Sequence, residues 1–327
     1  MVWVTAGPEP RAPMKTVSLG GSALTSSCLA YGCWRIAGTW DPELVNAERV
    51  ERGRAAAVTA YEVGYTLFDH ADIYCDGVAE KLFGQVLREV PEMRRGILIA
   101  SKCGIRKAGA PDAQAPYRYD FSANYIVESC EQSLRRLGVE TIDLYQLHRP
   151  DYLCEPAEVA RAFTQLKESG KVREFGVSNF RPSQVTMLRK ACPMPLIVNQ
   201  IELSLCRLEP FNDGTLDQCL GEGITPLAWS PLGGGRLGNQ AGTDLTDPMH
   251  ARKLRLLETL DGTARELGVS RSTVALAWLL RHPGGIVPIV GSTNPEHIRE
   301  ATAAVGLELG REHWYRLLEA ALGQRLP

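Results

Sequence analysis

The chain has 327 residues, of which 44% are hydrophobic and 23% are charged, and its formal net charge is −2. This balance excludes an intrinsically disordered chain and gives no global attraction to nucleic acid or to an anionic membrane. No apolar run approaches the roughly 18 residues of a spanning helix. The nine cysteines form no C-x-x-C pair, and the first residues carry no secretory signal pattern, so we expect a cytoplasmic location.

Short apolar runs alternate with amphipathic segments along the chain. Such runs are typical of parallel strands whose two faces are both covered by helices. Eight strands are expected, at 29–32, 66–69, 97–102, 142–148, 175–178, 196–200, 225–229 and 286–290. Helical periodicity is found at 48–63, 124–137, 156–169, 250–281 (two helices broken near 268–270), from 295 onward and at 311–322.

Eight strand–helix units without a linker predict one α/β domain over residues 1–327, a closed (β/α)₈ TIM barrel. An open doubly wound sheet usually carries a glycine-rich nucleotide fingerprint at its first turn, and the turn here, 32–38, does not match it. We expect residues 19–25 to form an N-terminal hairpin that closes the barrel bottom, after a loose tail at 1–15.

Two predicted connections are unusually long, 103–121 after the third strand and 232–249 after the seventh. Both follow the C-terminal ends of strands, where the active sites of such barrels lie. Long loops at this face are more often functional lids than accidental insertions, so we expect both to border the site.

Ionisable side chains of different types stand at three of these strand ends. Asp69, Lys102 and His148 close their strands, and Tyr74 follows Asp69 by five residues. A phenol with a pKa near 10 is a poor acid at neutral pH, and a neighbouring ammonium group lowers that pKa. We therefore expect Tyr74 to be a general acid activated by Lys102, with Asp69 holding Lys102 charged. His148 would orient a carbonyl oxygen, and a cofactor must supply the electrons.

Polar and aromatic residues at the other strand ends suit a nicotinamide ring. Donors and acceptors for its carboxamide stand at Ser178, Asn179 and Gln200, and Trp229 offers a face for stacking. The G-x-G-x-x-G match at 233–238 does not lead into a helix, so it predicts a loop that approaches a pyrophosphate rather than a Rossmann fold. The polar loop 291–296 opens a helix and offers an anion site.

Several segments together resemble the signatures of the aldo-keto reductase family, in the family's order: 68–74, 101–102, 142–148, 176–180, 199–202 and 229–233. The segments 31–35 and 232–237 most resemble a bacterial branch of that family typified by YdhF. The resemblance implies a monomeric or weakly associated barrel that reduces a small-molecule aldehyde or ketone with NADPH. It places the family's catalytic tetrad on Asp69, Tyr74, Lys102 and His148.

The resemblance also implies a dinucleotide site and a substrate pocket. In many members a lysine and an arginine bind the ribose 2′-phosphate, but the matching positions, Gly291 and His297, carry no fixed positive charge, so NADH use stays open. The expected cofactor-binding residues are Ser178, Asn179, Gln200, Trp229, Ser230, Leu232, Gly233, Gly234, Arg236, Gly291, Ser292, Thr293, Asn294, His297 and Glu300. Trp34, Trp40 and Tyr117 are expected to wall the substrate pocket, and Arg118 would suit a carboxylate or phosphate.

Two further classes of function fit part of the pattern. A metal-dependent hydrolase or isomerase could use Asp69, His70, Asp72, His148 and Glu202, but Lys102 would repel a cation and the H-x-H pair is missing, so no metal is expected. A glycosidase, which needs two carboxylic acids flanking a bond, fits poorly. A nicotinamide-binding redox sensor or regulatory subunit remains an alternative, with Cys75 and Cys103 as oxidisable thiols.

Overall fold

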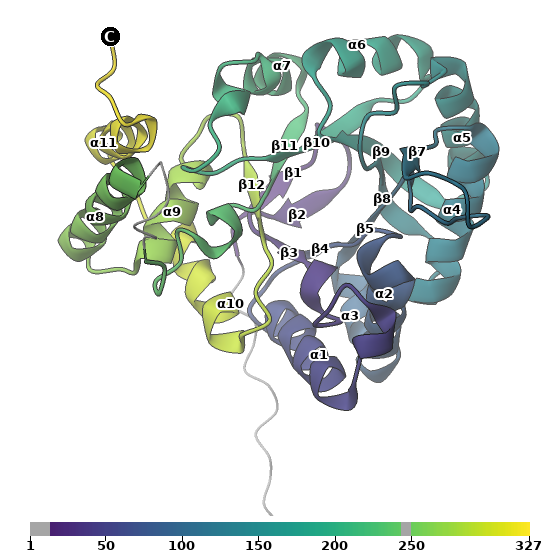
Figure 1. The fold of residues 1–327 in the computed structure, drawn as a ribbon, viewed down its shortest axis with the longest axis horizontal. Helices are drawn as coiled ribbons and strands as arrows, with labels where there is room; N and C mark the ends of the chain where they lie inside the picture. The colour runs from purple at the N-terminus through teal and green to yellow at the C-terminus, as the bar shows by residue number, and fades with distance from the viewer. Residues whose placement is uncertain (1–13, 243–249) are drawn as a thin grey trace, which may run out of the picture.

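Eight parallel strands close into a barrel in the computed structural model, which describes residues 14–242 and 250–327 (Figure 1). Around the barrel the strands follow chain order, and β12 pairs with β3 to complete the ring. Their bounds are β3 (Ala30–Gly32), β4 (Leu67–Asp69), β5 (Leu98–Cys103), β8 (Ile142–Leu147), β9 (Val172–Ser178), β10 (Leu196–Glu202), β11 (Thr225–Trp229) and β12 (Val287–Val290). All eight expected strands are present, with boundaries that shift by a few residues, and the predicted TIM barrel is confirmed.

Helices cover the outside of this barrel. They are α1 (Ala47–Glu62), α2 (Val78–Glu89), α3 (Pro91–Gly96), α4 (Ala123–Leu137), α5 (Pro156–Glu168), α6 (Pro182–Ala191), α7 (Thr215–Glu222), α8 (His250–Leu267), α9 (Arg271–Leu280), α10 (Pro295–Ala301) and α11 (Arg311–Leu322). Side chains fix several N-termini, as where Ser270 Oγ accepts a hydrogen bond from the Thr273 amide at the start of α9. The helices at α2, α3, α6 and α7 had not been predicted individually; α6 and α7 have only 10 and 8 residues, too few turns to show a clear period.

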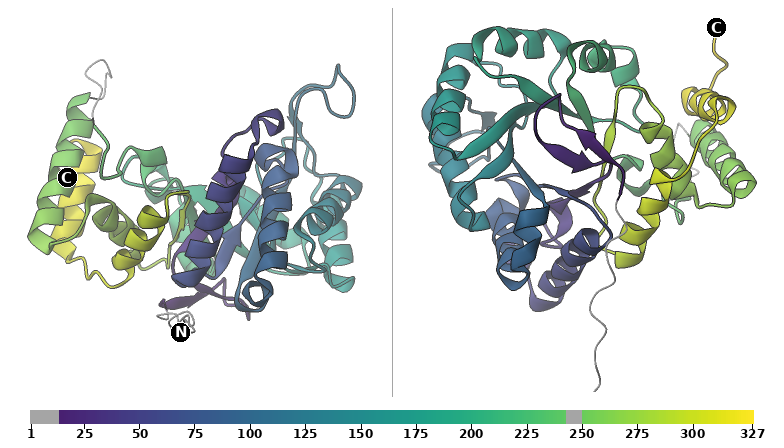
Figure 2. Two further views of the ribbon diagram at one scale, coloured as in Figure 1. Left: turned by 90° about the horizontal axis from the view of Figure 1, so that it is seen from below. Right: turned by 180° about the vertical axis from the view of Figure 1, so that it is seen from behind.

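The expected hairpin closes one end of the barrel. It pairs β1 (Thr16–Ser18) with β2 (Thr25–Ser27), and the view from behind shows it crossing the barrel opening (Figure 2). In its turn, the Gly20 amide donates to Thr225 Oγ1 at 2.8 Å. Gly20 has a φ of +55°, and a Cβ there would lie 2.4 Å from the carbonyl oxygen of Ile197, so this close approach requires glycine. The closed bottom leaves the opposite end for function.

Side-chain alternation along the strands separates an apolar barrel interior from a polar upper layer. Leu67, Ala100 and Val198 belong to the apolar cluster inside the barrel. Residues two positions further along a strand point to the same face, because the side-chain period of a strand is two. The residues in those positions are Asp69, Lys102 and Gln200, which are all buried. These three strands therefore place a polar side chain on the inner face at their C-terminal ends.

Both long connections lie at this polar end. The first is not plain loop: it contains an antiparallel ribbon of β6 (Ile105–Arg106) and β7 (Arg118–Tyr119), and its tip projects away from the end that the hairpin closes (Figure 2). The second begins with a 3₁₀ turn at Gly233–Gly235, and its residues 243–249 lie outside the described residues, as do residues 1–13 of the expected tail. Within the described part of the chain, no helix has the length and apolar character to cross a membrane.

Candidate active site

The side chain of Lys102 is at the centre of the polar layer and is fully buried. Its Nζ donates hydrogen bonds to Asp69 Oδ2 at 2.8 Å, to the Tyr74 hydroxyl at 3.0 Å and to the carbonyl oxygen of His70 at 2.7 Å. An ammonium group has three donors, and here all three are used. The predicted cluster of Asp69, Tyr74 and Lys102 therefore forms one hydrogen-bonded unit with a single geometry.

The charges of this unit follow from burial and pairing. Burial alone would lower the pKa of Lys102, but Asp69 and Tyr74 outweigh it and raise that pKa above its usual value, so the ammonium stays charged. Burial raises the pKa of Tyr74, and Lys102 offsets this effect only in part. The expected net lowering of the Tyr74 pKa is therefore wrong, because desolvation of the phenolate outweighs the adjacent charge. Tyr74 is a protonated phenol that accepts a hydrogen bond from a cation.

His148 completes the predicted tetrad as a neutral ring. Burial, together with the positive charges of Lys102 and Arg149, lowers its pKa well below the usual value. Its ring centroid lies 5.9 Å from that of Tyr74 in an edge-on arrangement. Neutral imidazole keeps one N–H donor, which suits it to hold an oxygen atom next to the phenol.

A second hydrogen-bonded chain ties the expected nicotinamide-binding residues to the tetrad. Gln200 Nε2 donates to Asp69 Oδ1 at 2.8 Å, and Ser178 Oγ donates to the Gln200 carbonyl at 2.9 Å. Asn179 Nδ2 donates to Ser178 Oγ at 2.8 Å, while Asn179 Oδ1 accepts from Trp229 Nε1 at 2.9 Å. Strand ends from both halves of the barrel therefore form one connected polar surface.

Backbone strain is concentrated around this surface. Of the described residues, four other than glycine have positive φ: Cys75 (47°), Asp76 (51°), Asn179 (63°) and Ser230 (51°). The first two directly follow Tyr74, and the other two directly follow β9 and β11. A left-handed conformation costs a side chain of this kind about 1–2 kcal/mol, so it persists only where neighbouring contacts enforce it. The strain orients the polar groups at the top of the barrel.

These groups face a cavity of about 810 Å³ at the C-terminal ends of the strands. Asp69, Tyr74 and His148 line it, and Lys102 lies behind them. Trp34, Trp40 and Tyr117 also line it as expected, with Trp40 and Tyr117 each about half exposed at its mouth. Of the fifteen expected cofactor-binding residues, eleven line the cavity, and the four that do not are Gly233, Arg236, Thr293 and Asn294.

Comparison with known proteins agrees with this geometry. The model of the aldo/keto reductase family matches residues 28–321. The chain belongs to this family. It is 40% identical over 321 residues to a 6-dehydroglucose reductase from Novosphingobium aromaticivorans, which covers 94% of this chain and 96% of that protein. It is also 40% identical to the oxidoreductase YdhF of Escherichia coli, over 81% of this chain and 86% of the relative.

A solved aldo/keto reductase-like barrel supports the same fold. The glycerol dehydrogenase from Gluconobacter oxydans superposes with a TM-score of 0.81 at 26% identity, over 95% of this chain and 97% of that one. The resemblance inferred from the sequence motifs is confirmed, and the chain is an oxidoreductase of the aldo/keto reductase family with a TIM-barrel fold.

The family typically uses a nicotinamide cofactor, and the cavity of this aldo/keto reductase fits one. Trp229 presents a ring fixed through its Nε1 hydrogen bond to Asn179. Gln200 donates to Asp69 through Nε2, so its Oε1 is left as an acceptor for a carboxamide N–H. Gly234 and Gly235 line the cavity with positive φ, and a Cβ on either would meet nothing within 4 Å, so the backbone at this turn is open to a ligand.

At the end of the cavity expected to hold the ribose phosphate, Gly291 and His297 stand in place of the lysine and arginine of many family members. At Gly291, a Cβ would lie 2.6 Å from Trp34 Nε1, so the indole of Trp34 excludes a lysine there. Ser292 Oγ lies 3.5 Å from His297 Nδ1, and both residues line the cavity. Asn294 instead caps α10 by accepting from the Glu296 amide, and Arg236 folds back to donate to the Gly233 carbonyl. These local contacts account for two of the four expected residues that stay outside the cavity.

The residues of the two alternative functions do not form a common site in the described structure, and of the metal-ligating set only Asp69 and His148 line the cavity. His70 is buried against Phe83 with a ring separation of 4.5 Å, and burial lowers its pKa to about 3. Asp72 accepts from Ser129 on α4. In the described residues, no group of three metal-ligating side chains was found. Cys75 and Cys103 are both buried, and burial raises the pKa of each thiol, which disfavours the reactive thiolate.

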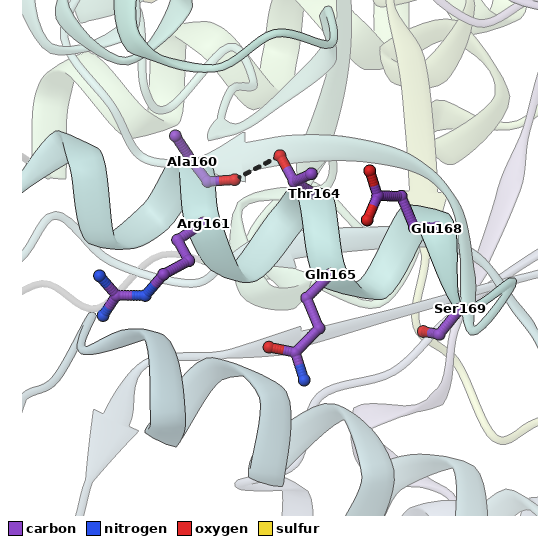
Figure 3. A pocket seen from close by; sticks show the side chains of 6 residues that line it. All are labelled: Ala160, Arg161, Thr164, Gln165, Glu168 and Ser169. Atoms are coloured by element: carbon purple, nitrogen blue, oxygen red, sulfur yellow. Dashed lines mark hydrogen bonds between the residues drawn. The ribbon is translucent and has the colours of Figure 1, made fainter.

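A second hollow lies outside the barrel, along one face of α5 (Figure 3). Its lining is six residues, Ala160, Arg161, Thr164, Gln165, Glu168 and Ser169. Thr164 Oγ1 donates to the Ala160 carbonyl within the same helix, and Arg161 pairs with Glu158. These are ordinary contacts of an exposed helix, and they bring no set of catalytic groups together.

Sequence reasoning missed several residues of the cavity wall. Arg35 and Arg149 both line it, whereas Arg118 donates to the carbonyls of Ala110 and Pro116 within its own ribbon and does not line it. Arg271 anchors the loop after β11 by donating to the carbonyls of Gly238 and Ala241. The signal for Arg149 was its place directly after His148; nothing in the pattern indicated that Arg118 would turn back on its own loop.

Proposed function

We propose that this aldo/keto reductase reduces aldehydes or ketones to alcohols with NADPH, and accepts NADH as a second donor, with Tyr74 as the general acid. The observation that carries the proposal is the Tyr74 hydroxyl, which lines the cavity at 3.0 Å from a buried ammonium that Asp69 holds at 2.8 Å. A relative named as a reductase, at 40% identity, supports the direction of the reaction.

Each residue of the tetrad has a separate role in the transfer of one proton. A nicotinamide held in this cavity would supply the hydride for the carbonyl carbon. Tyr74 gives its proton to the carbonyl oxygen, and Lys102, which already donates to the phenol oxygen, stabilises the phenolate that remains. Asp69 keeps Lys102 charged and in place. His148, whose ring lies edge-on to that of Tyr74 at 5.9 Å between centroids, donates a hydrogen bond to the same carbonyl oxygen.

Other groups that line the cavity would hold the dinucleotide. Ser178, Asn179 and Gln200 would bind the carboxamide, and Trp229 would stack on the ring. The open turn at Gly234 and Gly235 would bind the pyrophosphate. Ser292 and His297 would bind the ribose 2′-phosphate. We also propose a cytoplasmic location, because a reducing compartment suits the nine free cysteines. For the oligomeric state, we propose a monomer or a weakly associated oligomer.

The test is an assay of the loss of NADPH and NADH absorbance with a panel of aldehydes and ketones. Turnover that survives extensive treatment with a chelator is expected. Turnover that collapses with the chelator and returns with added metal would instead establish a metal-dependent enzyme. Tight dinucleotide binding by fluorescence titration, with no turnover of any carbonyl compound, would establish the redox sensor.

A further inference from the structure

Arg149 is a cation in the cavity wall that no acid of the described chain neutralises. It is half-buried, follows His148 directly and lines the same cavity as Tyr74. Its guanidinium lies 5.4 Å from the centroid of the Trp229 ring. Stacking on an aromatic ring leaves the N–H edges of a guanidinium free to donate. No hydrogen bond or ion pair joins Arg149 to a described carboxylate.

The acids near Arg149 have other partners. Asp151, two residues away, accepts from the amides of Phe121 at 3.0 Å and Leu153 at 2.9 Å. Asp69 is bound by Lys102 and Gln200. Glu300, at the other end of the cavity, accepts from Asn239 at 2.7 Å. Among the described residues, these three carboxylates are therefore engaged by other groups.

A second arginine adds positive charge to the same wall. Arg35 lies with its guanidinium 4.2 Å above the ring of Trp34, lines the cavity and has no carboxylate contact within the described residues. The tetrad has no spare negative charge to compensate the two arginines, because the charge of Asp69 is already paired with that of Lys102. The cavity thus combines the aromatic side chains of Trp34, Trp40 and Tyr117 with two guanidinium groups that no described carboxylate pairs.

We propose that the carbonyl substrate carries an anionic group, a carboxylate or a phosphate, and that Arg149 binds it while the carbonyl lies between Tyr74 and His148. This proposal rests on the proposed reduction of carbonyl compounds. A guanidinium binds both kinds of oxyanion through paired N–H donors, which makes Arg149 the specificity-determining residue. Arg35 adds to the positive potential of the same cavity.

The test compares aldehydes that differ in the anionic group. The pairs are 4-oxobutanoate with butanal for the carboxylate, and glyceraldehyde 3-phosphate with glyceraldehyde for the phosphate. In the unmodified protein, kcat/KM is expected to be about tenfold or more higher for the anionic member of at least one pair, and that pair identifies the oxyanion. Arg149→Met is expected to remove this preference, mainly through a higher KM for the anionic aldehyde.

Two further variants separate recognition from a structural role. Arg149→Lys keeps the charge and is expected to retain part of the preference, whereas Arg161→Met, which removes one charge from the distant exposed face of α5, is expected to retain all of it. Equal turnover of the anionic and neutral members, or an equal loss for both in Arg149→Met, would overturn the proposal.

Anion binding can also be measured without turnover. Because Arg149 stacks on Trp229, titration with succinate or glycerol 3-phosphate is expected to change the tryptophan fluorescence of the unmodified protein and not that of Arg149→Met. If no carbonyl compound is reduced but this Arg149-dependent signal is present, the proposed function fails while the anion site stands. If carbonyl compounds are reduced and neither anion gives the signal, the anion site fails alone.

Discussion

A single buried side chain, Lys102, joins the groups that we assign to catalysis. Its three donors are shared between Asp69, Tyr74 and the His70 carbonyl. Lys102→Met would leave the Asp69 charge buried with only Gln200 as a partner, and breaking a buried ion pair in this way costs about 3–5 kcal/mol.

We therefore expect Lys102→Met to lower the denaturation midpoint and to reduce carbonyl reduction by at least about a hundredfold. The double variant Asp69→Asn with Lys102→Met is expected to recover part of the stability and none of the activity. Chemical denaturation and the NADPH absorbance assay measure the two effects. Full activity in Lys102→Met would show that the phenol does not depend on its cation.

Because of the buried carboxyl group of Asp72, we predict that the free energy of unfolding depends on pH. Its Oδ1 is buried without a partner in the described chain, and burial together with Glu80 raises its pKa from 3.8 to about 7. Between pH 3.8 and about pH 7, the folded protein therefore keeps a proton that the unfolded chain has released. The stability that this proton contributes is lost as the pH rises through this range to the folded-state pKa.

Asp72→Asn removes that proton exchange. Between pH 5 and pH 8, the unfolding free energy of the variant is expected to fall by about 2–3 kcal/mol less than that of the unmodified protein, because the proton exchange extends over about two pH units at about 1.4 kcal/mol each. Denaturation curves at both pH values measure the difference, with Asp112→Asn on the exposed ribbon as a control that keeps the original pH dependence. Identical slopes for Asp72→Asn and the unmodified protein would show that Asp72 is ionised throughout.

At the same scale, strand periodicity located Asp69, Lys102 and His148, because the last inward position of a buried strand can be read from the chain. It did not give the direction of the Tyr74 pKa, which depends on how completely the helices and loops exclude water. Nor did it indicate that Arg149 would line the cavity while Arg118 would not. Arg118 donates to carbonyl groups of its own loop, and a strand period contains no information about such contacts.

At the scale of elements, helix α1 positions the aromatic wall of the cavity. A Cβ at Gly53 in this helix would lie 1.9 Å from the carbonyl oxygen of Ile36, in the segment that carries Trp34 and Trp40. Replacement of a helical glycine by alanine usually stabilises a protein by about 1 kcal/mol. Here the contact between the helix and the loop reverses that sign.

Gly53→Ala is expected to destabilise the fold by about 2 kcal/mol or more and to raise KM for the carbonyl substrate, because the loop must move. Gly262→Ala in α8, where a Cβ meets nothing within 4 Å, is the matched control and is expected to stabilise by about 0.5–1 kcal/mol. Thermal denaturation measures both variants. A stabilising effect at Gly53 would mean that α1 and the loop are not in close contact.

The elements also show where prediction from sequence ends. Long periodic helices such as α4 were found nearly to the residue, since Gly138 at its C-terminus has the left-handed φ of 67° that ends helices. The ribbon of β6 and β7 was expected only as a loop, because strands of two residues have no period to detect.

At the scale of the whole molecule, charge bears on the choice of dinucleotide. The net charge is −2, and the proposed phosphate end of the cavity offers Ser292 and His297 in place of fixed cations. The preference for NADPH over NADH, as a ratio of Kd values, is therefore expected to be less than about tenfold.

His297→Arg adds a cation at an exposed position and is expected to lower the Kd of NADPH about tenfold without changing that of NADH. Gly291→Lys is expected to destabilise the protein instead, because its Cβ meets Trp34. Fluorescence titration with both dinucleotides measures the ratio. A preference above a hundredfold in the unmodified protein would require a cation that the proposed site does not include.

The barrel itself was predictable because the pattern of a buried strand followed by a helix occurs eight times along the chain. An error at one strand boundary therefore does not change the predicted topology. The bottom hairpin was expected at residues 19–25, and in the structure these residues form mainly its turn, where Gly20 donates to Thr225. The cavity shape was not predictable, since it depends on contacts such as that of Trp34 with Gly291, which join the first strand's loop to the last.

The central claim is that the Tyr74 hydroxyl delivers the proton to the carbonyl oxygen. The most direct test is the single-turnover rate of Tyr74→Phe with saturating NADPH and a reducible aldehyde, measured together with the Kd of NADPH. We predict a loss of about a thousandfold or more in the rate with a Kd unchanged within about threefold, because only the proton donor is removed. A rate equal to that of the unmodified protein would contradict the mechanism.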